Sequence, residues 1–185
     1  MSQIVNFFNI NVPILKMISI GFKPVQSLLL VTGVGLVSYF TREYRFELSK
    51  GNPQPDPYDI GKLGRYEFYL YTASVGIIIS GLALVCILRG LLEKKYGATS
   101  MAIVQALWAS QLMISTALLF KVLTTYQETT ASGTPYCEYW NKLPEREYHH
   151  TCGQLIGGVV CGIFALALFA LDSIISMIFV LKSEA

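Results

Sequence analysis

The stretch GQLIGGVVCGIFALALFALDSIISMIFVL, residues 153–181, is a nearly uninterrupted apolar run with one charged residue, Asp172. An α-helix rises about 1.5 Å per residue, and the hydrocarbon core of a bilayer is about 30 Å thick, so about 20 apolar helical residues cross it. The stretch is long enough for this. It therefore predicts a membrane-spanning helix near the end of the chain.

Stretches without any charged side chain recur along the rest of the sequence. They cover residues 24–41, 68–88, 96–120 and 148–171. Each can form a membrane-spanning helix with a modest tilt. We therefore predict a single all-α domain over residues 1–185, a four-helix membrane bundle with spans at about 24–41, 68–88, 98–120 and 153–175, and outer loops at 42–67 and 121–152.

The overall composition agrees with a membrane protein. Hydrophobic residues make up 53% of the chain, and 14 Lys and Arg stand against 12 Asp and Glu, for a net charge of +2. Such a balance provides no basic surface for nucleic acid, and no long hydrophilic segment is available for a separate soluble domain. The start, MSQIVNFFNINV, is uncharged and is not typical of a cleaved signal peptide.

The segment before the first predicted span mixes apolar residues with two lysines, in PILKMISIGFK. We expect it to lie along the membrane interface, with Lys16 and Lys23 extending toward the headgroups. Pro24 then marks a kink or the start of the span, because proline removes a backbone donor. Tyr and Phe residues near the first outer loop, including Tyr44 and Tyr66, are typical of interfacial aromatic belts.

Cysteine positions predict the orientation better than the Lys/Arg bias of the loops, which does not decide it. Cys137 and Cys152 flank one polar loop, an arrangement expected for a disulfide in an oxidising compartment. Closing that loop would remove unfolded-chain entropy equivalent to about 3 kcal/mol. We therefore expect both longer loops outside and both termini in the cytoplasm; the alternative is two free cysteines in a cytosolic loop.

Groups that could perform catalysis are scarce. His149 and His150 are adjacent, so their side chains diverge, and no third ligand has metal-site spacing beside them. The sequence contains no CxxC, HExxH or phosphate-binding glycine loop. We therefore predict a protein that is not an enzyme and has no catalytic residue, metal or cofactor.

Asp172 has two interpretations. An acid within a membrane helix is by default a functional hypothesis. If the fourth span enters near Leu155, however, Asp172 lies near the cytoplasmic headgroups, where it would be an interfacial or helix-pairing acid.

Small residues spaced four apart place a groove on the fourth span. Gly153 pairs with Gly157 and Gly158 with Gly162, and the second span has a weaker face with Gly76 and Ser80. Such faces let another helix backbone approach closely. They serve either packing within the bundle or contact with a second molecule.

Polar residues are most frequent in the third span, where Gln105 and Gln111 would seek interhelical hydrogen bonds. By helical spacing the polar groups spread around the helix, which disfavours a pore. A channel or transporter lined by Gln105, Gln111 and Asp172 is nevertheless the alternative function.

The arrangement of spans and loops resembles the MARVEL-type four-pass architecture of occludin, synaptophysin and the myelin-and-lymphocyte proteins. Within it, the sequence is similar to the snakeskin family of insect smooth septate junctions. The similar segments are ILKMISIGFK, YEFYLYTASVGIIISG, ALWAS and the glycine-rich fourth span. The longer second outer loop, with Cys137 and Trp140, departs from that family, and the first loop lacks the claudin signature.

The resemblance implies a structural protein of the plasma membrane at cell junctions, without catalytic residues. Its partners would be the lipid bilayer and other membrane proteins or itself, not nucleic acid. A vesicle-trafficking role of the synaptophysin type is a further alternative.

Overall fold

A computed structural model describes residues 12–49, 64–128, 135, 137–138 and 151–184 of the chain. The described part is helical, with four long helices and one short 3-10 turn, η1 (Leu91–Glu93). The long helices are α2 (Val12–Ser49), α3 (Arg65–Leu88), α4 (Lys95–Gln127) and α6 (Cys152–Glu184). All four are long and apolar enough to cross a membrane, which confirms the predicted all-α integral membrane class.

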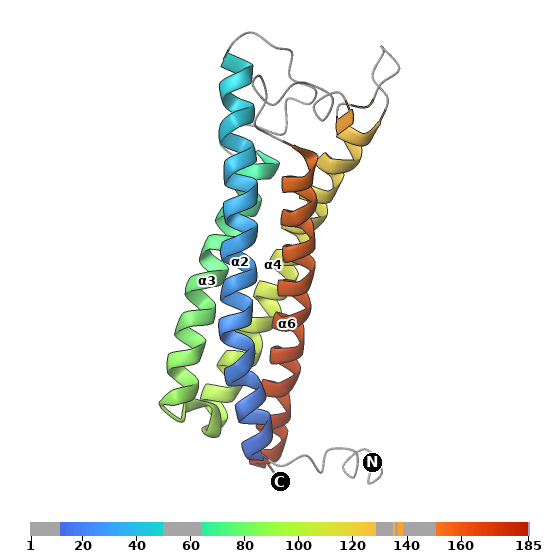
Figure 1. Cartoon of the computed structure of the whole chain (residues 1–185). Coiled ribbons are helices and arrows are strands. Elements are labelled where there is room, and N and C mark those ends of the chain that lie inside the picture. Colours follow the sequence, from blue (N-terminus) through green and yellow to red (C-terminus); the bar gives the residue numbers. More distant parts are fainter. Residues whose placement is uncertain (1–11, 50–63, 129–134, 136, 139–150, 185) are drawn as a thin grey trace.

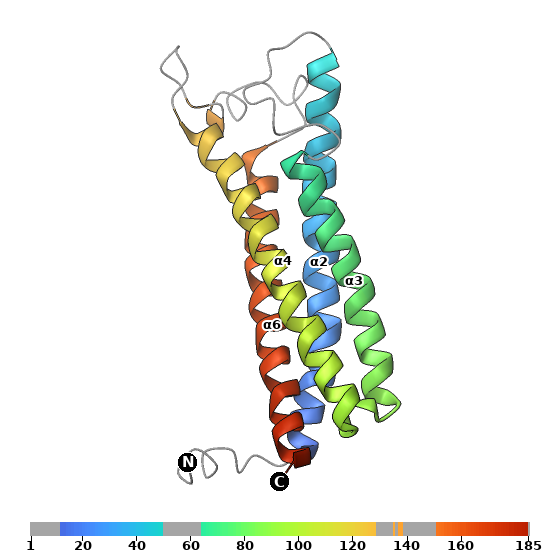
Figure 2. The ribbon, with the colours of Figure 1, turned by 180° about the vertical axis from the view of Figure 1, so that it is seen from behind.

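The four helices form an elongated bundle in which successive helices run in opposite directions (Figure 1). At one end α2 and α4 finish and α3 and α6 begin; we call this the loop end. At the opposite end η1 joins α3 to α4, and we call this the turn end (Figure 2). Gly90, with φ of 73°, gives the tight turn a left-handed residue that glycine adopts without strain.

The order of packing places α2 and α4 between the other two helices. Both α3 and α6 pack against α2 and α4, and the contact of α4 with α6 is the most extensive. The first and last helices of the chain are therefore direct neighbours.

The helix α2 begins earlier than the sequence predicted. It runs without interruption through Pro24, whose ring is exposed on the outer surface of the bundle. The predicted interfacial approach with a snorkelling Lys23 is wrong, because Lys23 is 1% exposed and lies inside the bundle. A polar partner on α6 accounts for this burial, as described below. The other helices also extend into the predicted loops, with α4 continuing to Gln127.

Glycines of α6 bring this helix close to its neighbours. A Cβ atom added at Gly158 would collide with Val37 of α2, and one at Gly162 would lie 2.5 Å from Thr116 Oγ1 of α4. Gly157 faces Leu36 in the same way, at 2.6 Å, whereas Gly153 has only Thr151 Oγ1 nearby, at 3.6 Å. Three of the four predicted glycines thus serve packing within the chain.

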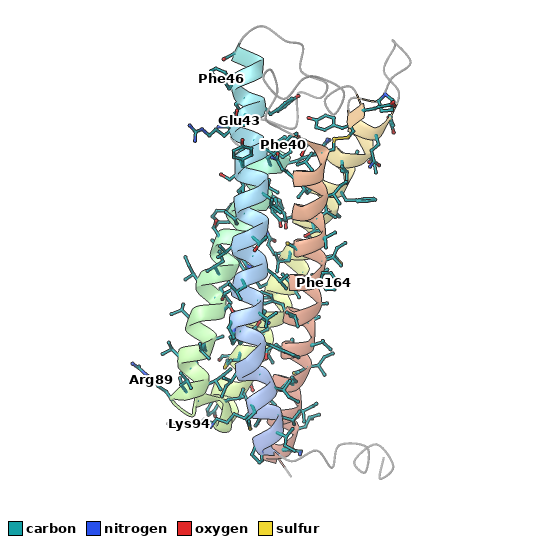
Figure 3. All side chains as sticks on the ribbon, viewed as in Figure 1. Phe40, Glu43, Phe46, Arg89, Lys94 and Phe164 are labelled. Carbon is teal, nitrogen blue, oxygen red and sulfur yellow. A yellow bond between two sulfur atoms is a disulfide. The ribbon has the colours of Figure 1, made fainter. Side chains whose placement is uncertain are left out.

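The predicted small face on α3 also points inward. A Cβ at Gly76 would lie 2.8 Å from Trp108 Nε1 and 2.9 Å from Leu30 Cδ1, and Ser80 is fully buried. Outward faces instead carry large apolar side chains, such as Leu28 and Leu107. Phe164 of α6 is another of them (Figure 3). This distribution suits a surface that contacts lipid.

Aromatic rings fill the interior at the loop end. Phe40 and Tyr44 stack at 5.8 Å between ring centroids, and Tyr44 lies 6.1 Å from Tyr126. The Tyr66 hydroxyl donates to that of Tyr126 at 3.0 Å. Tyr44 and Tyr66, which the sequence suggested as members of an interfacial aromatic belt, are buried, and their rings join α2, α3 and α4.

We predict that Gly158→Leu and Gly162→Leu each lower the free energy of unfolding by about 1–3 kcal/mol, because the added side chain overpacks a close helix contact. Thermal unfolding of the purified protein in detergent measures this. Gly35→Leu is the matched control, since nothing lies within 4 Å of a Cβ added there. Unchanged unfolding with loss of oligomers would instead assign the glycines to a contact between molecules.

Candidate functional site: a buried polar cluster

An ion pair lies inside the bundle between the first and last helices. Lys23 Nζ of α2 contacts Asp172 Oδ2 of α6, and the two side chains are 1% and 0% exposed. Each charge lies on a helix of a membrane-spanning bundle, where an unpaired charge is costly. The pair therefore gives each residue the partner that the surrounding apolar side chains cannot provide.

Three neutral side chains, those of Ser19, Gln26 and Ser80, join this ion pair. We call the five residues the polar cluster: Ser19, Lys23, Gln26, Ser80 and Asp172. The Ser19 hydroxyl donates to Asp172 Oδ1, and Lys23 Nζ donates to Gln26 Oε1 at 3.5 Å. From α3, the Ser80 hydroxyl lies 3.0 Å from the carbonyl oxygen of Lys23 and 3.1 Å from Gln26 Oε1. Three helices thus contribute to one hydrogen-bonded network.

Helical spacing explains why these residues meet. Positions 19, 23 and 26 follow the i, i+4, i+7 pattern, so their side chains share one face of α2. On α6, Phe169 lies one turn before Asp172, and its ring centroid is 6.0 Å from Lys23 Nζ. A ring at this distance attracts the ammonium group weakly through its electron-rich face. The lysine is thus bordered by a carboxylate and an aromatic ring of the same helix.

Asp172 lies within α6 and not at its end. The helix continues for about 18 Å beyond Asp172 to Glu184, at 1.5 Å per residue. The carboxylate is completely buried between helices. Of the two interpretations, the structure therefore favours a helix-pairing acid inside the bundle.

Further polar groups are buried on the neighbouring faces. Ser173 donates to the carbonyl oxygen of Ala102 at 3.0 Å, which links α6 to α4. Gln105 is 1% exposed. Its Oε1 atom has no hydrogen-bond partner among the described residues, and Gln26 Nε2 and Ser176 Oγ also lack one there. Gln111 is half-buried.

The predicted site residues are only partly brought together. Ser80 and Asp172 join the polar cluster, whereas no hydrogen bond links Gln105 or Gln111 to it among the described residues. Ser19, Lys23 and Gln26 were not among the predicted site residues. Their i, i+4, i+7 spacing was a usable signal, but the first span was drawn to begin after Lys23 and so excluded it.

The two loop cysteines are bonded to each other. Cys137 and Cys152 form a disulfide with a Cα–Cα distance of 5.5 Å, at the loop end where α6 begins. Cys152 is buried and Cys137 packs against the aromatic-rich core. The bond fixes the end of the α4–α6 connection to the bundle. Cys86 and Cys161 are free and half-buried.

Metal-binding groups are not found in the described part of the chain, where no three His, Cys, Asp or Glu side chains are grouped to hold an ion. His149 and His150 lie outside the described residues. The chemistry of the polar cluster is that of hydrogen bonding and charge pairing. It can hold helices together, or exchange partners if the bundle moves.

Comparisons of the chain with protein-family models, with curated proteins and with solved structures find no match. The resemblance to the snakeskin family and to MARVEL-type proteins therefore stays a prediction from the sequence.

We predict that Asp172→Asn lowers the free energy of unfolding by about 3–5 kcal/mol, because Lys23 then keeps a buried charge without its counter-ion. Replacing both residues, as Lys23→Met with Asp172→Leu, should recover most of this loss, since no buried charge remains. Thermal unfolding in detergent and yield of folded protein measure both effects.

The matched control is Glu128→Gln, which removes an acid from the exposed end of α4 and should leave unfolding unchanged. A double variant as unstable as Asp172→Asn alone would show that the ion pair is not the stabilising contact.

Proposed function

We propose that this chain is a non-enzymatic four-pass membrane protein that organises a cell–cell junction or membrane subdomain of the plasma membrane. It would act through its outer loops on partners and through its lipid-facing helices within the bilayer. The observation that carries the proposal is the contrast between the interior and the loop end. Inside the bundle, Lys23 and Asp172 pair across helices, while at the loop end, where both long connections are attached, a disulfide holds the start of α6.

A rigid loop end supports a role in contact with partners. The disulfide fixes the start of α6, and Arg45 of α2 forms an ion pair with Glu67 of α3. The aromatic cluster described above joins α2, α3 and α4 just below. Loops attached to such a platform emerge from fixed positions, which lowers the entropy lost when they bind a partner.

The disulfide also supports an orientation. Disulfides persist in oxidising compartments, so the loop end would face the cell exterior and both termini the cytoplasm. The sequence resemblance to the snakeskin family points in the same direction, toward a structural protein of cell junctions.

A channel or transporter is the second candidate, favoured by one observation. Within the described residues, Gln26 Nε2 of the polar cluster has no hydrogen-bond partner, and neither have the buried Gln105 Oε1 and Ser176 Oγ. Such polar atoms could bind a polar solute or water. Reconstitution tests this: a flux that Asp172→Asn abolishes would favour transport, and an inert wild-type protein would exclude it.

The orientation predicts a specific labelling pattern in intact cells. After treatment with a membrane-impermeant reductant, Cys137 and Cys152 should react with an impermeant maleimide reagent, whereas without reductant they should not. Substituting the two free cysteines, as Cys86→Ser with Cys161→Ser, removes background labelling. Reaction only after permeabilisation would place the loop end in the cytoplasm.

The junctional role is tested by localisation with an epitope inserted in the first outer loop, stained in unpermeabilised cells. We expect staining concentrated at cell contacts, and reduced clustering in Cys137→Ser, because loss of the disulfide releases the second outer loop. The Cys86→Ser variant is the matched control. Staining confined to intracellular vesicles would instead support a trafficking role of the synaptophysin type.

A further inference from the structure

A hollow of about 370 Å³ opens between α2 and α3 at the loop end, away from the polar cluster. Its walls combine basic, hydroxyl and apolar side chains. From α2 come Ser38, Thr41, Arg42 and Arg45, and from α3 come Glu67 and Leu70. Positions 38, 41, 42 and 45 follow the i, i+3, i+4, i+7 pattern, so they line one face of α2.

The charges of this hollow are unbalanced. Arg45 is paired with Glu67, which satisfies one guanidinium. Arg42 is exposed and, within the described part of the chain, has no acidic partner. The acid next to it in sequence, Glu43, does not line the hollow. One positive charge is therefore left over, together with the hydroxyl of Ser38, one turn before Arg42.

The hollow lies where the charge-free stretch of α2 ends, because Arg42 is the first charged residue after residues 24–41. Phe46, near the end of α2, is 58% exposed, and exposed aromatic residues at helix ends are typical of the membrane interface (Figure 3). Leu70, by contrast, is an apolar wall residue. A ligand here would place a polar group beside the arginines and an apolar body along α2 and α3.

We propose that this hollow binds the phosphate of an anionic phospholipid. A guanidinium donates two parallel hydrogen bonds to phosphate oxygens, which suits the uncommitted Arg42. Ser38 can donate a third. A zwitterionic lipid also has a phosphate, but its headgroup cation would enter a hollow that two guanidinium groups, of Arg42 and Arg45, and one carboxylate, of Glu67, leave with an excess of positive charge. The excess charge therefore favours a net anionic headgroup.

The test uses the full chain purified in a neutral detergent and titrated with phosphatidylglycerol or phosphatidylcholine. Bound lipid is counted by native mass spectrometry. We expect phosphatidylglycerol to bind more tightly, and Arg42→Gln to weaken it about tenfold, the effect of losing one charged hydrogen-bonding group. Arg42→Lys should retain part of the affinity, because it keeps the charge without the planar fork.

Arg89→Gln is the matched control, since Arg89 is exposed at the turn end (Figure 3). An equal loss in Arg89→Gln would overturn the proposal, because binding would then follow net charge alone. Equal affinity for the two lipids would overturn it as well. Displacement of the lipid by millimolar inorganic phosphate or glycerol phosphate would assign the hollow to soluble phosphates rather than to a membrane lipid.

Discussion

A hydrocarbon interior leaves buried polar groups no water to bind, so each charged side chain within the bundle needs a partner from another helix. Lys23 and Asp172 meet this requirement for one another, and they come from the first and last helices of the chain. Their contact makes α2 and α6 neighbours although they are far apart in sequence. Ser80 adds α3 to the same network.

Different interactions hold the bundle together at different levels. Toward the turn end the polar cluster joins three helices, and in the middle the α6 glycines let α2 and α4 approach closely. At the loop end, aromatic rings, an ion pair and a disulfide replace them. This order of interactions along the bundle suits a membrane protein. Ion pairs and hydrogen bonds satisfy polar groups in apolar surroundings without water, whereas tyrosine rings, which carry hydroxyl groups, tolerate the nearby interface.

The functional proposals depend on this division. A network whose charged members pair across helices favours a bundle that keeps one arrangement, and under the proposed function its loop end would be the side that meets partners. The hollow beside Arg42 lies at the same end, so a bound anionic lipid would add to the surface there. Transport would require the opposite property, an interior whose hydrogen bonds exchange as the helices move.

The sequence by itself determined the number and approximate position of the membrane helices, because hydrophobicity and length are local properties. Even so, the predicted first span began after Lys23, because a lysine considered in isolation is expected to lie in water. The sequence also left open whether the glycines of α6 face inward and which group pairs with Asp172. Only the tertiary structure decided these points. The environment of Lys23, Asp172 and Gly158 is made by residues more than a hundred positions away or on other helices, and burial of a charge is favourable only once its partner is in place.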